Sequence, residues 1–176
     1  MTPPTLPVGP APEPGPEAPT RDAVRPALDS LAEAPARLAG ALEGLTPDQL
    51  DTPYRNWTVR QIAHHLPDSH LNAYTRCMLA LTEETPAIRP YDEGAWSELD
   101  VSRTGDVRLA IALLGSVHAK WDALLRTLSG EQLARRFRHP EHGAEFRVGD
   151  MPRLYDWHAR HHTAQIAWLR DHHGWG

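Results

Sequence analysis

Residues 57–81 read WTVRQIAHHLPDSHLNAYTRCMLAL. Thr58 is a typical helix N-cap, and the apolar side chains after it recur at three- and four-residue intervals, as on one face of a helix. These apolar positions are Val59, Ile62, Leu66, Ala73, Cys77 and Leu81. The pattern predicts a helix from Thr58 to about Leu81 that ends before Pro86. Pro67 removes a backbone donor inside this helix and is expected to bend it.

The segments on either side of this helix are less regular. Apolar positions in the Ala-rich stretch 20–44 have helical spacing, but Pro26 and Pro35 predict an irregular or broken first helix. A short turn of helix is expected at 47–51, where a proline follows a threonine cap. Residues 82–104 form a polar stretch that favours turns.

The second half of the chain adds two more long helices. Amphipathic periodicity predicts a third helix from about 106 to 128, ended by Ser129-Gly130, and a last helix from about 149 to 172. Between them, the alternating and Gly-punctuated segment 137–148 favours a small hairpin. Four long helices with medium connections predict an all-α fold, an antiparallel four-helix bundle, with binding sites between facing helices.

Composition bounds the domain organisation and the partners. Residues 1–19 are so rich in Pro and Gly that they are expected to form an extended or disordered arm, followed by one domain over 20–176. The net charge of −5 and pI of about 6.1 give no reason to expect nucleic acid or an acidic membrane as partner. The chain has a single cysteine, Cys77, and no apolar run long enough to span a bilayer. It also has no recognisable targeting segment, so we expect a cytoplasmic location.

The last predicted helix places histidines within an apolar face. His158, His161 and His162 fall inside the arc that Leu154, Trp157 and Ile166 define. A buried imidazole needs a partner, because an unpaired buried polar group costs about 1–3 kcal/mol. His158 and His162, four residues apart, can bind one metal ion, but His158 and His161 also share a face. The spacing alone leaves metal binding and satisfied core histidines equally open.

The second predicted helix carries a polar stripe made of Gln61, His65, Asp68, Asn72 and Arg76. The pattern alone favours a solvent-exposed face. The alternative is the polar wall of a pocket, which would supply a metal ligand, an orienting carboxylate and an anion-binding guanidinium. The bend expected at Pro67 is one way to turn this face inward.

Two long stretches resemble a known family. WTVRQIAHHLPDSHLNAYTRCMLALTEETPAIRPYDEGAW at 57–96 and LYDWHARHHTAQI at 154–166 are similar to the YfiT-like branch of the DinB-like superfamily of four-helix bundles. The resemblance covers nearly the whole chain after the arm. It implies one divalent metal ion per chain, bound by His65, His158 and His162, with His161 outside the ligand set. Zinc and nickel are the expected metals, and the family resemblance also implies a homodimer.

The resemblance implies two possible chemistries. The family includes metal-dependent hydrolases and S-transferases that join the low-molecular-weight thiol bacillithiol to electrophiles. Three histidine ligands leave a coordination position open for water or a thiol. Transfer is favoured because the sequence shows no obvious extra carboxylate near the histidines to act as a hydrolytic base. Asp68 is the nearest candidate for that catalytic role, and it could equally orient His65. Asn72 and Arg76 are candidates to contact the carboxylates of the thiol, and a surface ion pair is the equally open alternative. A bundle that only binds metal, without catalysis, is the third possibility.

Overall fold

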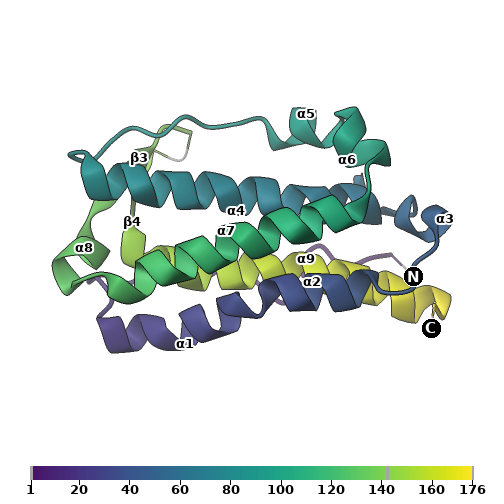
Figure 1. The fold of residues 1–176 in the computed structure, drawn as a ribbon, viewed down its shortest axis with the longest axis horizontal. Coiled ribbons are helices and arrows are strands. Elements are labelled where there is room, and N and C mark those ends of the chain that lie inside the picture. Colours follow the sequence, from purple (N-terminus) through teal and green to yellow (C-terminus); the bar gives the residue numbers. More distant parts are fainter. Residues whose placement is uncertain (1, 142, 176) are drawn as a thin grey trace.

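The structure is a computed structural model that describes residues 2–141 and 143–175. Its long helices form a bundle whose members lie lengthwise beside one another (Figure 1). The first member is divided into two helices, and the others are single; they are α1 (Arg21–Ala32) with α2 (Ala34–Leu42), α4 (Val59–Thr82), α7 (Val107–Thr127) and α9 (Met151–His173). The predicted all-α four-helix bundle is confirmed.

The remaining elements are short. Three are helices near the turns of the bundle: α3 (Pro47–Leu50), α5 (Glu93–Ser97) and α6 (Asp100–Thr104). Before α9 come α8 (Gly130–Ala134), the antiparallel strands β3 (Arg136–His139) and β4 (Ala144–Arg147), and a 3-10 turn at Val148–Asp150. Strands β1 (Pro53–Tyr54) and β2 (Trp57–Thr58) form a two-residue ladder.

The connection between α4 and α7 sets the directions of the helices. It carries the chain back along the bundle before α7 begins, so that α4 and α7 run in the same direction (Figure 1). These two helices pack against each other, and α9 packs against α1, α2 and α4. The bundle therefore consists of one parallel pair, α4 and α7, that runs antiparallel to α1–α2 and α9.

Most predicted helix boundaries lie within one or two residues of the structure. The first helix breaks at Glu33, just before Pro35, as the proline pattern predicted. The segment 82–104 was expected to contain only turns, but it contains α5 and α6. Ser129-Gly130 does end α7, but Ser129 also caps α8, which the sequence did not predict. The hairpin predicted at 137–148 is present as β3–β4, and its residue His142 lies outside the described residues.

A capping box fixes the start of α4. The Thr58 hydroxyl accepts a hydrogen bond from the Gln61 backbone N–H, and the Gln61 side-chain oxygen accepts one from the Thr58 N–H. The Gln61 amide also donates to the Ser97 carbonyl at 3.0 Å and to the Glu98 carboxylate at 3.0 Å. One side chain thus sets the first turn of α4 and holds α5 over it.

Two clusters of buried apolar side chains fill the bundle. Ala73, Trp121 and Tyr155 belong to one, and Leu66, Leu114 and Ala159 belong to the other. His70, His118 and His158 occupy the level between the two clusters on α4, α7 and α9. Three imidazoles from three helices therefore share one level of the interior.

The Pro-rich arm lies against its own chain rather than apart from it. Residues 2–19 have no helix or strand, and they run back along α9. Side chains of the bundle donate to carbonyls of the arm: Trp157 Nε1 to Gly9 at 3.1 Å, Tyr54 Oη to Pro4 at 2.5 Å. The extended conformation agrees with its composition. The side-chain donors of the bundle hold the arm in this position, and the sequence pattern does not reveal them.

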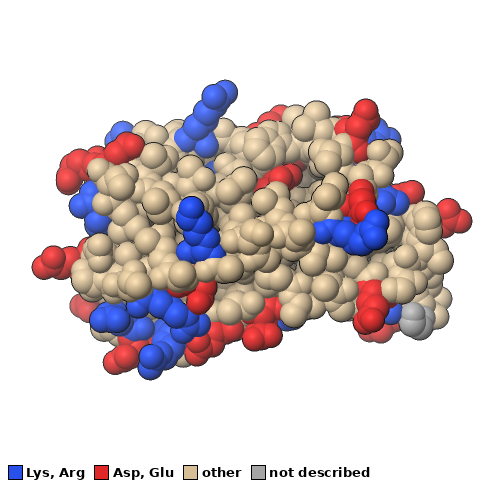
Figure 2. Space-filling view, viewed as in Figure 1, with Lys and Arg blue, Asp and Glu red and all other residues tan. Residues whose placement is uncertain are grey.

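The surface carries charges of both signs. On the face shown in Figure 2, Lys and Arg are interspersed with Asp and Glu, and large areas between them are uncharged. Within the described residues, the structure has no helix with the length and apolarity that a bilayer span requires.

Gly149 marks a tight contact where the arm meets the start of α9. A Cβ at this position would lie 2.8 Å from Pro19 Cγ and 3.1 Å from the Leu133 carbonyl oxygen. We expect Gly149→Ala to destabilise the protein by about 1–3 kcal/mol in urea denaturation, because the backbone must shift to admit the methyl group. Gly115→Ala in α7, where a Cβ meets open space, is the matched control and is expected to stabilise by roughly 0.5–1 kcal/mol. Equal effects of the two substitutions would contradict this packing.

Candidate metal centre

Three imidazoles from two helices converge between α4 and α9. His65 lies on α4, and His158 and His162 lie about one turn apart on α9, so that they share a face of that helix. One ring nitrogen of each residue lies within 4.8 Å of the others. Nε2 of His65 and Nε2 of His158 are 3.2 Å apart. The structure thus brings together the three residues that the resemblance named as ligands.

This donor set fits a divalent transition metal. Two nitrogens each about 2.1 Å from an ion in tetrahedral geometry are roughly 3.4 Å apart, close to the separation seen between His65 and His158. Imidazole nitrogens suit zinc, nickel, copper and iron alike. Three donors from the protein leave a tetrahedral ion one position for water or a substrate atom, as in catalytic rather than structural sites.

Burial favours neutral rings at this site. His65 and His162 are buried, and His158 is partly exposed. Desolvation lowers the pKa of His65 to about 4. Desolvation, followed by the neighbouring rings, holds the pKa of His158 and of His162 well below the usual imidazole value. Because a metal binds the unprotonated nitrogen, protons compete only weakly with it near neutral pH.

Gln165 orients the ring of His162. The amide oxygen of Gln165 lies 2.8 Å from His162 Nδ1, and its amide nitrogen lies 3.0 Å from His161 Nε2. An amide oxygen only accepts, so His162 donates from Nδ1 and its Nε2 keeps a free lone pair. His161 accepts from Gln165 and stacks on Trp157 at 4.9 Å between ring centroids. His161 therefore lies beside the cluster with its Nε2 already occupied.

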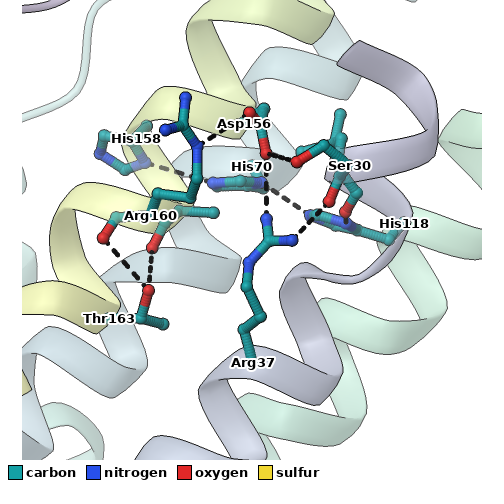
Figure 3. Close-up of polar contacts among 10 residues, drawn as sticks. Ser30, Arg37, His70, His118, Asp156, His158, Arg160 and Thr163 are labelled. Atoms are coloured by element: carbon teal, nitrogen blue, oxygen red, sulfur yellow. Dashed lines mark hydrogen bonds and ion pairs between the residues drawn. The ribbon is translucent and has the colours of Figure 1, made fainter. Parts of the chain in front are cut away.

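His158 is held from the opposite side by two more histidines. His158 Nδ1 lies 3.2 Å from His70 Nε2, and His70 Nδ1 lies 2.7 Å from His118 Nε2. His118 Nδ1 lies 3.0 Å from the Leu31 carbonyl oxygen. Figure 3 shows the three rings in a row, reaching from α9 across α4 to α7. The row joins the candidate ligand His158 to the backbone at the end of α1.

The polar stripe of α4 is not the solvent-exposed face that its pattern favoured. Gln61 and His65 are buried, and Asp68, Asn72 and Arg76 are half-buried. That preference was wrong for the first two residues, because α5 and α9 cover this side of the helix. Burial raises the pKa of Asp68 to about 6.

Asp68 does not orient His65. Among the described residues, its carboxylate makes no hydrogen bond to the His65 ring; the ring nitrogen of His65 faces His158. The ring that contacts a candidate ligand from behind is His70, which lies next to His158. Asp68 also does not line the cavity beside the ligands.

A cavity of about 550 Å³ opens beside the histidines, and we call it the His162 cavity. Trp57, His162 and Gln165 form part of its wall, and the Trp57 ring lies 4.5 Å from that of His65. Arg55 and Glu93 also line it. A substrate in this cavity would contact a candidate ligand directly.

A second cavity of about 530 Å³, the Arg76 cavity, shares Glu93 as a wall. Arg76 lines it, and its Nε is buried without a hydrogen bond among the described residues. Asn72 lines a third cavity, of about 430 Å³, and donates to the Asp68 carbonyl. This third cavity shares Pro90, Tyr91 and Asp92 as walls with the Arg76 cavity, so Asn72 and Arg76 line adjacent cavities.

Sequence reasoning missed four residues near the centre: His70, His118, Gln165 and Glu93. His70 falls on the apolar arc of α4, where a polar ring requires a partner, and that was the one available signal. Glu93 belongs to a stretch expected to contain only turns. Burial, together with Asp92 and Glu141, raises the pKa of its carboxyl.

Comparison with known proteins adds independent findings. A model of the DinB superfamily matches residues 30–166. The chain is 53% identical over 150 residues to a Bacillus subtilis protein named "Putative metal-dependent hydrolase YfiT", covering 84% of each chain. A Bacillus mycoides protein named "Putative metal-dependent hydrolase BcerKBAB4_2443" is 44% identical over 150 residues, which cover 84% of this chain and 86% of that protein. The solved structure of YfiT from Bacillus subtilis, described as a probable metal-dependent hydrolase with an unusual four-helix bundle topology, matches with a TM-score of 0.93 and 46% identity over 98% of both chains.

Proposed function

The chain belongs to the DinB superfamily, and from this premise we propose that it is a metal-dependent enzyme whose ion is held by His65, His158 and His162. The convergence of these three imidazoles beside a cavity carries the proposal. When bound, such an ion lowers the pKa of a coordinated nucleophile and polarises the substrate. The protein supplies neutral ligands, holds their orientation through Gln165 and His70, and leaves the His162 cavity for the reactants.

For the nucleophile we propose the thiol of a small acidic cofactor of the bacillithiol type, which is transferred to an electrophilic substrate. Two cations support this choice. Arg55 lines the His162 cavity, and Arg76, with an unpaired Nε, lines the adjoining cavity. Guanidinium groups bind carboxylates through paired hydrogen bonds, so either residue can anchor a carboxylate of the thiol.

Hydrolysis is the second candidate, and a specific observation favours it. Glu93 borders both cavities, and partial burial raises the pKa of its carboxyl, the direction that makes a carboxylate a better general base. The sequence argument against hydrolysis was the lack of such a carboxylate beyond Asp68. The names of the relatives also support this candidate.

One experiment separates the two chemistries. The cobalt-substituted protein is titrated with bacillithiol, and the protein is assayed with monochlorobimane plus thiol and with a panel of esters and amides. Thiol transfer predicts a new sulfur-to-metal charge-transfer band and a large rate excess with thiol. Hydrolysis predicts neither, and instead metal-dependent turnover of an ester or amide. That second result would remove the transferase proposal.

Two variants refine this test. Arg76→Gln is expected to raise the Michaelis constant for the thiol with little change in kcat, because a carboxylate anchor contributes equally to ground and transition states. Arg103→Gln, on α6 in an exposed ion pair with Glu98, is the matched control. Glu93→Gln should lower kcat by about 10²–10⁴ only if Glu93 is the base of a hydrolase. The zinc or nickel ion and the homodimer implied by the resemblance stay part of this proposal, and metal analysis and light scattering test them.

A further inference from the structure

The row His158–His70–His118 ends on a backbone group that can only accept a hydrogen bond. The Leu31 carbonyl oxygen lies 3.0 Å from His118 Nδ1, so the proton of that contact belongs to His118. This carbonyl is available because of the sequence around it. Its helical partner would be the N–H four residues later, and that residue is Pro35, which has none. The proline that breaks the first helix thus leaves an acceptor for the row.

One fixed proton sets the positions of the others. A neutral His118 that donates from Nδ1 has an unprotonated Nε2, so His70 must donate to it from Nδ1. The Nε2 of His70 is then unprotonated and accepts from His158 Nδ1. His158 is left with a lone pair on Nε2, the nitrogen that lies 3.2 Å from His65 Nε2.

The surroundings exclude water from His70 and His118. His70 is 0% exposed and His118 is 4% exposed. The Tyr155 ring meets His70 edge-on at 4.9 Å between centroids, and Trp121 lies edge-on to both rings at 6.4 Å. Low polarity favours neutral rings over charged ones and strengthens each hydrogen bond.

We propose that His70 and His118 are positioning residues that hold His158 as the tautomer protonated on Nδ1, and so aim its Nε2 lone pair at the space between His65 and His162. The tautomer itself follows from the contacts, whereas its purpose as a metal ligand rests on the proposed function. A metal-bound histidine usually donates to a carboxylate or a carbonyl. A neutral imidazole in that place adds no negative charge beside the ion, so the ion keeps more of its ability to polarise a substrate.

The direct test uses the metal-free protein and needs no variant. Long-range ¹H–¹⁵N correlation spectra at pH 7.5 distinguish the two tautomers of each histidine side chain. We expect protonation on Nδ1 at His118, His70 and His158. Protonation of His158 on Nε2 would overturn the proposal, whether or not the protein binds a metal.

Variants test the role toward the metal. His118→Leu removes both the acceptor for His70 and the contact to Leu31, and it is expected to weaken zinc binding by about 10–100-fold in calorimetric titration, the usual loss for an outer partner of a ligand. His118→Gln restores a donor and an acceptor on one side chain, so it should recover most of the affinity and the His158 tautomer. Leu114→Ala, one turn earlier on α7 and buried, controls for lost packing and should leave zinc affinity unchanged.

Three results would overturn the positioning role. One is an unchanged affinity in a folded His118→Leu protein. Another is equal loss in His118→Leu and Leu114→Ala. The third is a failure of His118→Gln to recover affinity although it folds. If the wild-type protein binds no zinc at all, the proposed function fails. The spectra still show whether His118, His70 and His158 are protonated on Nδ1.

Discussion

Replacement of His65, His158 or His162 by Ala is expected to abolish stoichiometric binding of a divalent ion. Each residue supplies one of the three nitrogens that lie within 4.8 Å of one another. Removal of one leaves two donors. Loss of a residue that only orients a ligand lowers metal affinity by about 10–100-fold, and we expect loss of a ligand to lower it further. Calorimetric titration with zinc and with nickel, and metal analysis of the purified proteins, measure the effect.

His161→Ala is the matched control. It lies beside His162 on the same helix and is also buried, but its Nε2 accepts from Gln165. It should keep about one ion per chain. The proteins must be prepared without a metal-affinity step, because exposed His172 and His173 near the end of α9 can bind metal on their own. Equal loss in all four variants would show that the ligand choice is wrong.

The sequence was sufficient for the fold because its helices carry their own signals. Thr58 and Gln61 form the capping box that starts α4, and both are visible as residue types at the right spacing. The Pro35 break in the first helix was equally local. Elements that depend on the rest of the chain were missed: α5 is short, and the Gln61 amide holds it in place from α4.

The candidate site was less accessible to sequence reasoning. Helical spacing alone left His161 and His162 as equal partners of His158, and only the family resemblance chose between them. What distinguishes them in the structure is a single side chain, Gln165, which donates to one ring and accepts from the other. The row through His70 and His118 ends on the carbonyl oxygen of Leu31, which is 87 positions from His118, and no periodicity within one helix can predict such a contact.

Acidification of the metal-free protein is expected to unfold it between about pH 6.5 and 4. Desolvation lowers the pKa of His65 and of His118 to about 4, whereas each returns to about 6.5 in the unfolded chain. Between these values the unfolded state binds more protons than the folded state, so the free energy of unfolding falls as the pH falls below about 6.5. At the acid end of this window, each group has lowered the free energy of unfolding by on the order of 3 kcal/mol. Two of them amount to a large part of the roughly 5–15 kcal/mol that holds a typical domain folded.

The sign of this dependence survives the groups that oppose it. Burial raises the pKa of Asp68 to about 6, so that carboxyl stabilises the folded state as the pH falls. His70, His158 and His162 act in the opposite direction, because their pKa values also lie well below the usual one.

Urea denaturation at intervals of half a pH unit measures this dependence, and the slope of the free energy of unfolding against pH gives the proton uptake on unfolding. His118→Gln should make the slope shallower by about one proton. Saturating zinc should move the transition to lower pH, because it binds the folded state and its ligands are already neutral. A free energy of unfolding that is flat from pH 7 to 4.5 would mean that these histidines are solvated or paired with charges in solution, and not buried between α4, α7 and α9.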